Sequence, residues 1–261
     1  MKKKLINYIK KSKNVIEKIK FKLHINIGQY TDLDYNKAQI QIRASSWAEY
    51  KIRKTSCKRE PYTVSWLESL KNNAILFDIG ANIGAYSLIA ASLQKNITVY
   101  SFEPHFANFE SLIMNIIQNN LGESIIPVNI AVGKQTAIGT FAHWSEYSLG
   151  ESGSSGHQLN RTKNSMNIDF EPAFMQKIIA MSLDDFCSLY KIVPNAIKID
   201  VDGIELEIID AGKKTLSDKR VKDVIIEVSD ATQNELLKKM KNYGFTLVHI
   251  AEHGNHHFQR K

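Results

Sequence analysis

The sequence predicts an α/β protein built on one doubly wound, mostly parallel sheet with an antiparallel C-terminal hairpin. Two observations favour this fold class. From residue 74 onward, short apolar strand patterns alternate with helical patterns of about 10 to 15 residues, which is typical of βαβ units. Near the C-terminus, strand patterns at 245–250 and 256–258 flank a short turn, which indicates a hairpin.

The elements follow in a regular order. An alternating segment at 38–43 and a helical pattern at 62–70 precede the first buried strand. Later strand patterns are 74–77, 97–102, 125–131, 139–144, 175–181, 195–200 and 223–228, and helical patterns are 86–91, 107–120, 182–190, 204–211 and 233–242. Segment 175–181 is predicted as an edge strand, and Ser182 with Asp185 resembles a capping box. The rhythm breaks at about 133–180, where a polar stretch indicates a lid, an acceptor-binding loop or disorder.

A glycine-containing loop follows the first buried strand and reads Asp78-Ile79-Gly80-Ala81-Asn82-Ile83-Gly84. Gly80 and Gly84 let the backbone approach a ligand, and the next helix directs its unsatisfied N–H groups to the same place. A carboxylate at Asp78 disfavours a pyrophosphate and suits a cationic ligand such as S-adenosylmethionine. The alternative is a tight strand-to-helix turn without a ligand.

The second strand ends at Glu103. An acidic residue roughly 20 residues beyond a glycine loop, at the end of the neighbouring strand, is placed to accept hydrogen bonds from both ribose hydroxyls of an adenosine. The alternative is a solvated carboxylate that opens the following helix, where the helix dipole favours negative charge.

Composition is that of a soluble globular protein with one principal domain: 261 residues, 43% hydrophobic and 23% charged. The positive charge is concentrated in residues 1–24, which hold nine lysines and one glutamate. The rest of the chain is nearly neutral, so the high pI describes a basic amphipathic arm. We therefore assign residues 1–50 to a basic N-terminal extension and 51–261 to the main domain, with an insertion at about 133–180.

No signal-peptide core follows the lysines and no apolar run is long enough to span a membrane, so we expect a cytoplasmic protein. Three roles stay open for residues 1–24: peripheral contact with anionic lipid on the inner membrane surface, contact with nucleic acid, or a packing extension. Cys57 and Cys187 are too few for a disulfide framework and lack metal-ligand spacing, so we expect reduced thiols.

Three carboxylates follow the fourth sheet strand: Asp200, Asp202 and Glu205. Asp202 as N-cap with Glu205 three residues later suits a capping box, and a functional role fits equally well. Asp200 has no capping role, and we predict that it orients an acceptor, acts as a general base or binds a divalent metal such as Mg²⁺. Alternative bases are His105, His143 and His157. The histidines between 249 and 257 match no standard metal-ligand spacing.

These motifs resemble those of the FkbM-type methyltransferases, a family of S-adenosylmethionine-dependent class I enzymes. The resemblance covers about residues 53–261. It runs through Glu60-Pro61-Tyr62-Thr63, the glycine loop, Phe102-Glu103-Pro104, Asn129-Ile130-Ala131-Val132-Gly133 and Ser182-Leu183-Asp184-Asp185. Its most specific part is Ile197-Lys198-Ile199-Asp200-Val201-Asp202-Gly203-Ile204-Glu205. The family usually has Glu where this chain has Asp202, which keeps the charge and shortens its reach.

The resemblance implies a Rossmann-like class I fold, S-adenosylmethionine as cofactor, and Asp200 and Asp202 at the place of methyl transfer. It implies cofactor contact by residues of four motifs: Asp78, Gly80, Asn82, Gly84, Glu103, Asn129, Glu60 and Thr63. The implied activity is O-methylation of a hydroxyl on a sugar, glycoconjugate or glycosylated metabolite. Because the main domain offers no basic track, nucleic acid is not an expected partner. A nucleic-acid methyltransferase and a non-catalytic binding protein on the same fold are the alternatives.

Overall fold

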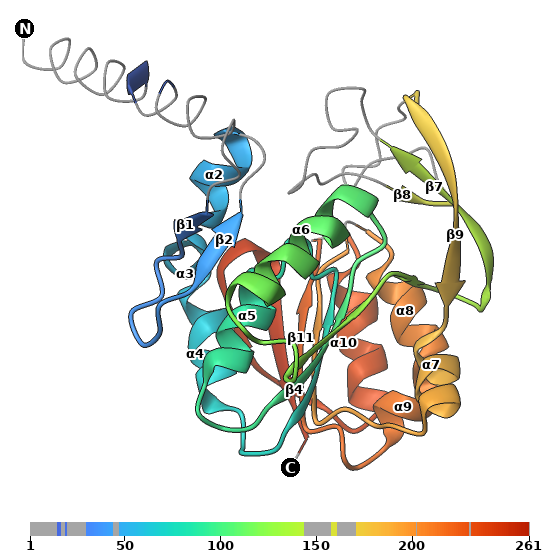
Figure 1. The fold of residues 1–261 in the computed structure, drawn as a ribbon. Coiled ribbons are helices and arrows are strands. Elements are labelled where there is room, and N and C mark those ends of the chain that lie inside the picture. Colours follow the sequence, from blue (N-terminus) through green and yellow to red (C-terminus); the bar gives the residue numbers. More distant parts are fainter. Residues whose placement is uncertain are drawn as a thin grey trace, which may run out of the picture.

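A seven-stranded sheet forms the centre of the molecule (Figure 1), in the order β12-β13-β11-β10-β3-β4-β5. The computed structural model describes residues 15–16, 19, 30–43, 47–143, 158–160, 171–201, 203–229 and 231–260. The strands are β3 (Ile75–Ile79), β4 (Thr98–Phe102), β5 (Ile125–Val128), β10 (Ala196–Ile199), β11 (Asp223–Glu227), β12 (Thr246–Ile250) and β13 (Asn255–Gln259). From β5 to β11 all neighbours are parallel, whereas β13 is antiparallel to both β11 and β12. The predicted sheet and its C-terminal hairpin, which turns through the 3-10 helix η2 (Glu252–Gly254), are confirmed.

Helices cover both faces of this sheet. One face carries α4 (Pro61–Ser69), α5 (Ala85–Ser92) and α6 (Phe106–Gln118), and the other carries α7 (Leu183–Tyr190), α8 (Glu205–Ala211), α9 (Lys213–Ser217) and α10 (Gln233–Asn242). Because side chains alternate along a strand, central strands such as β3 and β4 contribute to two separate apolar cores. Leu76 and Val99 join the core under α4 to α6, whereas Phe77 and Phe102 join the core under α7 to α10.

The segment before α4 consists of β1 (Tyr30–Asp32), β2 (Gln41–Arg43), α2 (Trp47–Arg53) and α3 (Ser56–Arg59). The backbone N–H groups of Gln41 and Arg43 donate to the side-chain oxygens of Asn119 and Asn115, at 2.8 and 2.7 Å. Ile40 and Ile42 are buried in the first core. Part of the predicted N-terminal extension, residues 30–43, therefore packs into the main domain. Of the basic arm, only Val15, Ile16 and Ile19 are described, and these are helical and exposed.

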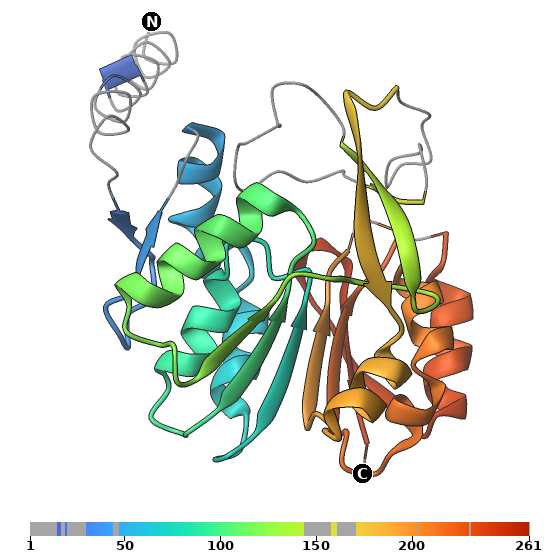
Figure 2. The ribbon, with the colours of Figure 1, turned by 45° about the vertical axis from the view of Figure 1, so that its right-hand side comes forward.

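The insertion contributes a second sheet, in the order β6-β9-β7-β8. Its strands are β6 (Ala131–Val132), β7 (Ala137–His143), β8 (Gln158–Leu159) and β9 (Phe174–Met181). Figure 2 shows β7 and β9 rising on the side where the parallel strands of the main sheet end. Residues 144–157 and 161–170, which include the polar stretch predicted as a lid or acceptor-binding loop, lie outside the described residues.

Two strand predictions are wrong in this region. The pattern at 125–131 divides into β5 and β6, because the chain leaves the main sheet after Val128. Segment 175–181 is not an edge strand, since β9 lies between β6 and β7 and pairs with both. The predicted cap at Ser182 is confirmed, because its side chain accepts a hydrogen bond from the backbone N–H of Asp185 at 3.1 Å.

Candidate active site

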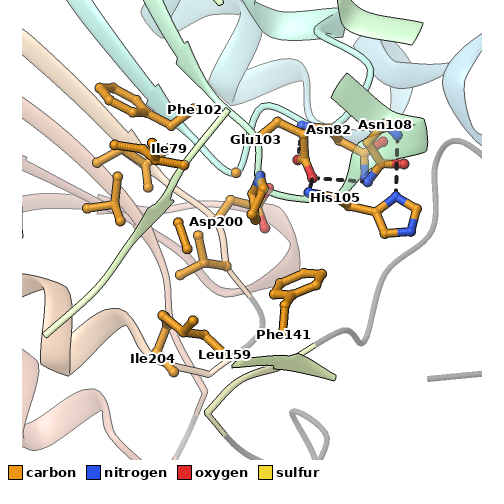
Figure 3. Close-up of a pocket in the computed structure, with 16 residues that line it drawn as sticks. Ile79, Asn82, Phe102, Glu103, His105, Asn108, Phe141, Leu159, Asp200 and Ile204 are labelled. Atoms are coloured by element: carbon orange, nitrogen blue, oxygen red, sulfur yellow. Dashed lines mark hydrogen bonds between the residues drawn. The ribbon is translucent and has the colours of Figure 1, made fainter. Parts of the chain in front are cut away.

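A pocket opens at the carboxyl ends of β3, β4 and β10 (Figure 3). The space between its lining residues is about 660 Å³, open solvent at its mouth included. Residues at or just after the strand ends form a polar side of the pocket. Apolar side chains of the insertion and of the turn before α8 form the opposite side. The polar side contains Gly80, Asn82, Glu103 and Asp200, and the apolar side contains Phe141, Leu159 and Ile204.

Hydrogen bonds fix the loop between β3 and α5. The N–H groups of Gly80 and Ala81 both donate to the carbonyl oxygen of Phe102, at 3.0 and 2.9 Å. Asn82 adopts a left-handed conformation with φ 52°, and its side-chain oxygen accepts from the N–H of Ile83 at 2.9 Å. The loop is therefore held in one shape against the end of β4.

The two loop glycines are required by the protein's own packing. Gly80 has φ +83°, and a Cβ there would lie 1.9 Å from the carbonyl oxygen of Asp200. Gly84 has φ +89°, and a Cβ there would lie 2.4 Å from Leu112 Cδ1. Close approach of neighbouring elements is therefore one reason for these glycines, and close approach of a ligand stays a prediction.

Glu103 is buried at the end of β4. Its Oε2 accepts from the N–H of Asn82 at 2.8 Å, and its Oε1 accepts from the N–H of His105 at 2.9 Å and from Asn108 Nδ2 at 3.3 Å. Burial raises the pKa of Glu103 to about 7, although these hydrogen bonds lower it. Because a carboxylate oxygen has two lone pairs, Oε2 retains one for a ligand hydroxyl.

A buried polar cluster lies on the α5 side of the sheet. Asp78 and Lys198 are partners in the register of β3 and β10, and both are 2% exposed. Asp78 Oδ2 accepts from Ser87 Oγ at 2.5 Å, and Ser87 Oγ lies 2.7 Å from Ser101 Oγ. Asp78 Oδ1 is buried without a hydrogen-bond partner in the described part of the chain. Burial raises the pKa of Asp78, and the charge of Lys198 opposes this.

Lys198 pairs with Asp200 in the same cluster. Lys198 Nζ lies 2.6 Å from Asp200 Oδ2 and 5.0 Å from the centre of the Tyr86 ring. Burial alone would lower the pKa of Lys198, but Asp200, Glu60 and Asp78 raise it above its usual value. Burial alone would raise the pKa of Asp200, but Lys198 and a hydrogen bond with Glu227 hold it well below its usual range. Asp200 is therefore an ionised carboxylate, and its side chain is 32% exposed.

The methyltransferase FkbM domain model matches residues 78–247. The chain belongs to the FkbM methyltransferase family. The family predicted from the motifs is thereby confirmed, and with it an S-adenosylmethionine-dependent methyltransferase of the class I fold.

Solved methyltransferase structures resemble this family member at low identity. One is a precorrin-6y C5,15-methyltransferase from Geobacter metallireducens GS-15, with 15% identity, a TM-score of 0.43, and coverage of 76% of this chain and 84% of that one. Another is TYW2 from M. jannaschii in complex with AdoMet, with 12% identity, a TM-score of 0.44, and coverage of 90% and 89%. No curated protein matches the chain. Within the described residues, no helix is long and apolar enough to cross a membrane.

The residues of this FkbM methyltransferase fit S-adenosylmethionine. When bound, this cofactor supplies an electrophilic methyl group on a sulfonium cation, beside an ammonium group. The carboxylates of Asp200, Glu60 and Asp78 act on the buried cation Lys198, so the cluster complements added positive charge. The buried Asp78 Oδ1 offers an acceptor for such a donor, and Glu103 Oε2 offers one for a ribose hydroxyl.

The predicted cofactor residues divide into two groups. Gly80, Asn82 and Glu103 line the pocket, whereas the others are not among its lining residues: Asp78, Gly84, Asn129, Glu60 and Thr63. Asn129 Nδ2 donates to the carbonyl oxygen of Glu103 at 2.8 Å. Glu60 Oε2 accepts from Thr63 Oγ1 at 3.0 Å, and Thr63 is fully buried. This second group supports the lining residues.

Of the two predicted catalytic residues, Asp200 lines the pocket and Asp202 lies outside the described residues. The predicted N-cap role of Asp202 is wrong, because α8 begins at Glu205 with Ile204 as its N-cap. In the turn before this helix, Glu205 Oε1 accepts a hydrogen bond from the backbone N–H of Gly203 at 2.9 Å.

The alternative bases differ in their surroundings. His105 lines the pocket, and burial, with a smaller effect of His143, lowers the pKa of His105 to about 4. His105 is therefore neutral near pH 7. His143 is fully buried, and His157 lies outside the described residues.

The proposed magnesium role of Asp200 is not supported. Among the described residues, no group of three or more His, Cys, Asp or Glu side chains is arranged to hold a metal ion. In the C-terminal histidine cluster, both ring nitrogens of His257 are engaged, Nδ1 with Tyr62 Oη at 2.9 Å and Nε2 with Asp223 Oδ1 at 3.1 Å. These contacts tie α4 to the C-terminal hairpin.

Sequence reasoning missed Lys198 as the partner of Asp200, and it missed the apolar wall of the pocket. A signal for Lys198 existed, because a lysine between Ile197 and Ile199 in a buried strand requires a counter-charge. Phe141 and Leu159 carried no such signal, since their place depends on how the second sheet docks on the first.

Proposed function

We propose that this methyltransferase methylates a hydroxyl oxygen of its acceptor, with Asp200 receiving the hydroxyl proton. The observation that carries this proposal is the Lys198–Asp200 ion pair of 2.6 Å at the pocket. An ionised carboxylate there accepts a hydrogen bond from an acceptor hydroxyl and orients its oxygen toward the methyl carbon.

The low pKa of Asp200 determines when the proton moves. Such a carboxylate is too weak a base to deprotonate a resting hydroxyl. The hydroxyl proton becomes strongly acidic as the oxygen gains its new bond to carbon, and Asp200 then accepts it. The mechanism thus needs a positioned, ionised carboxylate more than a strong base.

For the acceptor we propose a hydroxyl of a sugar, glycoconjugate or glycosylated metabolite. The support is the family pattern together with two neighbouring carboxyl groups, Asp200 directly after β10 and Glu227 at the end of β11. Neighbouring carboxyl groups suit acceptors that carry several hydroxyls, because each oxygen accepts hydrogen bonds.

A transfer assay with labelled cofactor over a panel of glycosides, simple alcohols and nucleic acids tests this proposal. We expect label in glycosides and none in nucleic acid. Asp200→Asn should lower turnover by about 100-fold or more, the scale of a lost positioned acid or base, while cofactor affinity stays within a few-fold. A matched control is Asp210→Asn, an exposed carboxylate of α8 that pairs with Lys239 at 2.7 Å. Full activity of Asp200→Asn, or label only in nucleic acid, contradicts the proposal.

A further inference from the structure

Arg53, the last residue of α2, connects to the buried cluster through a short series of contacts. Its carbonyl oxygen accepts from Ser56 Oγ at 2.9 Å. The carbonyl oxygen of Ser56, in turn, accepts from Tyr86 Oη at 3.5 Å. The Tyr86 ring faces Lys198 Nζ, which pairs with Asp200. Arg53 therefore belongs to the same end of the sheet as the pocket.

One donor of the Arg53 guanidinium group is left unsatisfied within the described part of the chain. Its Nε is buried without a hydrogen bond, and Arg53 takes part in none of the ion pairs between described residues. Burying a polar donor without an acceptor is unfavourable, and such donors are usually paired. An anionic ligand would supply the acceptor that this buried donor lacks.

The position of this charge follows from its neighbours. Arg53 lowers the pKa of Glu103 at the end of β4, of Asp200 after β10, and of Tyr86 in α5. The glycine loop that follows β3 lies between these two carboxylates, because its Gly80 approaches the carbonyl oxygen of Asp200 and the N–H of its Asn82 donates to Glu103. The ribose and sulfonium ends of the cofactor are expected on either side of that loop.

We infer that Arg53 binds the carboxylate of the methionine part of S-adenosylmethionine, an inference that rests on the proposed function. This part of the cofactor carries an ammonium and a carboxylate group. The acidic cluster suits the ammonium and repels the carboxylate, which therefore needs its own cation. Lys198 is taken by Asp200, and the planar guanidinium of Arg53 binds a carboxylate through two parallel hydrogen bonds.

Calorimetry with three adenosyl compounds tests this inference. S-adenosylmethionine carries the carboxylate, decarboxylated S-adenosylmethionine lacks only that group, and 5′-methylthioadenosine lacks the whole amino-acid part. We expect Arg53→Met to weaken the affinity for S-adenosylmethionine by about ten- to a hundredfold, the scale of hydrogen bonds to a charged group. Binding of the other two compounds should change by less than about threefold. Arg53→Lys should restore part of the loss.

Lys54→Met is the matched control, because it removes the neighbouring positive charge. Lys54 Nζ donates to Tyr50 Oη at 3.2 Å and lies 4.2 Å from the centre of its ring, so we expect unchanged affinity for all three compounds. If Arg53→Met weakened the binding of all three adenosyl compounds equally, Arg53 would have a structural role and the inference would be overturned. Unchanged affinity for S-adenosylmethionine would overturn it as well. If the wild type bound none of the three, the proposed function would fail and the inference with it.

Discussion

Glu103 and Asp200 are both carboxylates at strand ends, yet their surroundings shift their pKa values in opposite directions. Burial dominates at Glu103 and raises its pKa to about 7. At Asp200, the charge of Lys198 outweighs burial and holds the pKa low. One residue is therefore poised to titrate near neutral pH, whereas the other stays ionised throughout the physiological range.

Cofactor affinity should fall as the pH drops below about 7, because ribose hydroxyls donate to the ionised form of Glu103 and protons compete for it. The expected loss is up to about tenfold per pH unit, measured by calorimetry on both sides of that value. Glu103→Ala should weaken binding by about 1.5 to 3 kcal/mol and remove this pH dependence. An affinity that does not vary with pH in the wild type would place the ribose elsewhere.

Among the elements, the unit of β3, the glycine loop and α5 determines the shape of the site. The N–H groups of Gly80 and Ala81 donate to the carbonyl oxygen of Phe102 in β4, and Gly80 closely approaches the backbone that follows β10. Three parallel strands are thus joined at their carboxyl ends by one short loop. A change in this loop is transmitted directly to both Glu103 and Asp200.

Gly80→Ala should destabilise the protein by about 3 kcal/mol or more, since it combines a positive φ with a clash against backbone. The new Cβ would lie 1.9 Å from the carbonyl oxygen of Asp200. Urea unfolding measures the effect. Gly122→Ala is the control, because no atom lies within 4 Å of its Cβ position, and its stability should be nearly unchanged. Equal stability of the two variants would show that the loop backbone shifts at little cost to accommodate the new Cβ.

The elements differ in how far the sequence could predict them. Buried parallel strands such as β3, β4 and β10 are short apolar runs, so local pattern is enough to find them and the acidic residues at their ends. The second sheet escaped prediction, because pairing of β6 with β9 joins segments separated by the whole insertion. Arg53 escaped for a related reason: the carboxylates on which its charge acts come from other elements, and spacing within one motif does not reveal them.

At the scale of the whole molecule, charge and catalysis lie in different parts of the chain. The basic arm of residues 1–24 precedes every motif of the site, and the domain that follows is nearly neutral. Residues 30–43, by contrast, belong to the core through Ile40 and Ile42. A boundary between arm and domain therefore falls before residue 30.

We propose that residues 1–24 mediate contact with anionic membrane surfaces, and that their deletion leaves folding and cofactor binding intact. Sedimentation with vesicles should show that the full chain binds anionic lipid, that added salt weakens this binding, and that the truncated chain does not bind. Vesicles of uncharged lipid are the control. Insolubility of the truncated chain, together with no vesicle binding by the full chain, would identify the arm as a packing or oligomerisation element.

The buried cluster around Lys198 also ties the protein's lifetime to its metabolic surroundings. Asp200, Glu60 and Asp78 act on one buried ammonium group, so the free protein holds mutually repelling carboxylates close together. A cationic cofactor relieves this repulsion and binds only the folded chain, which raises the melting temperature as its concentration rises. We therefore expect cells depleted of methyl donor to degrade this enzyme faster, so that its abundance follows the supply of its own cofactor.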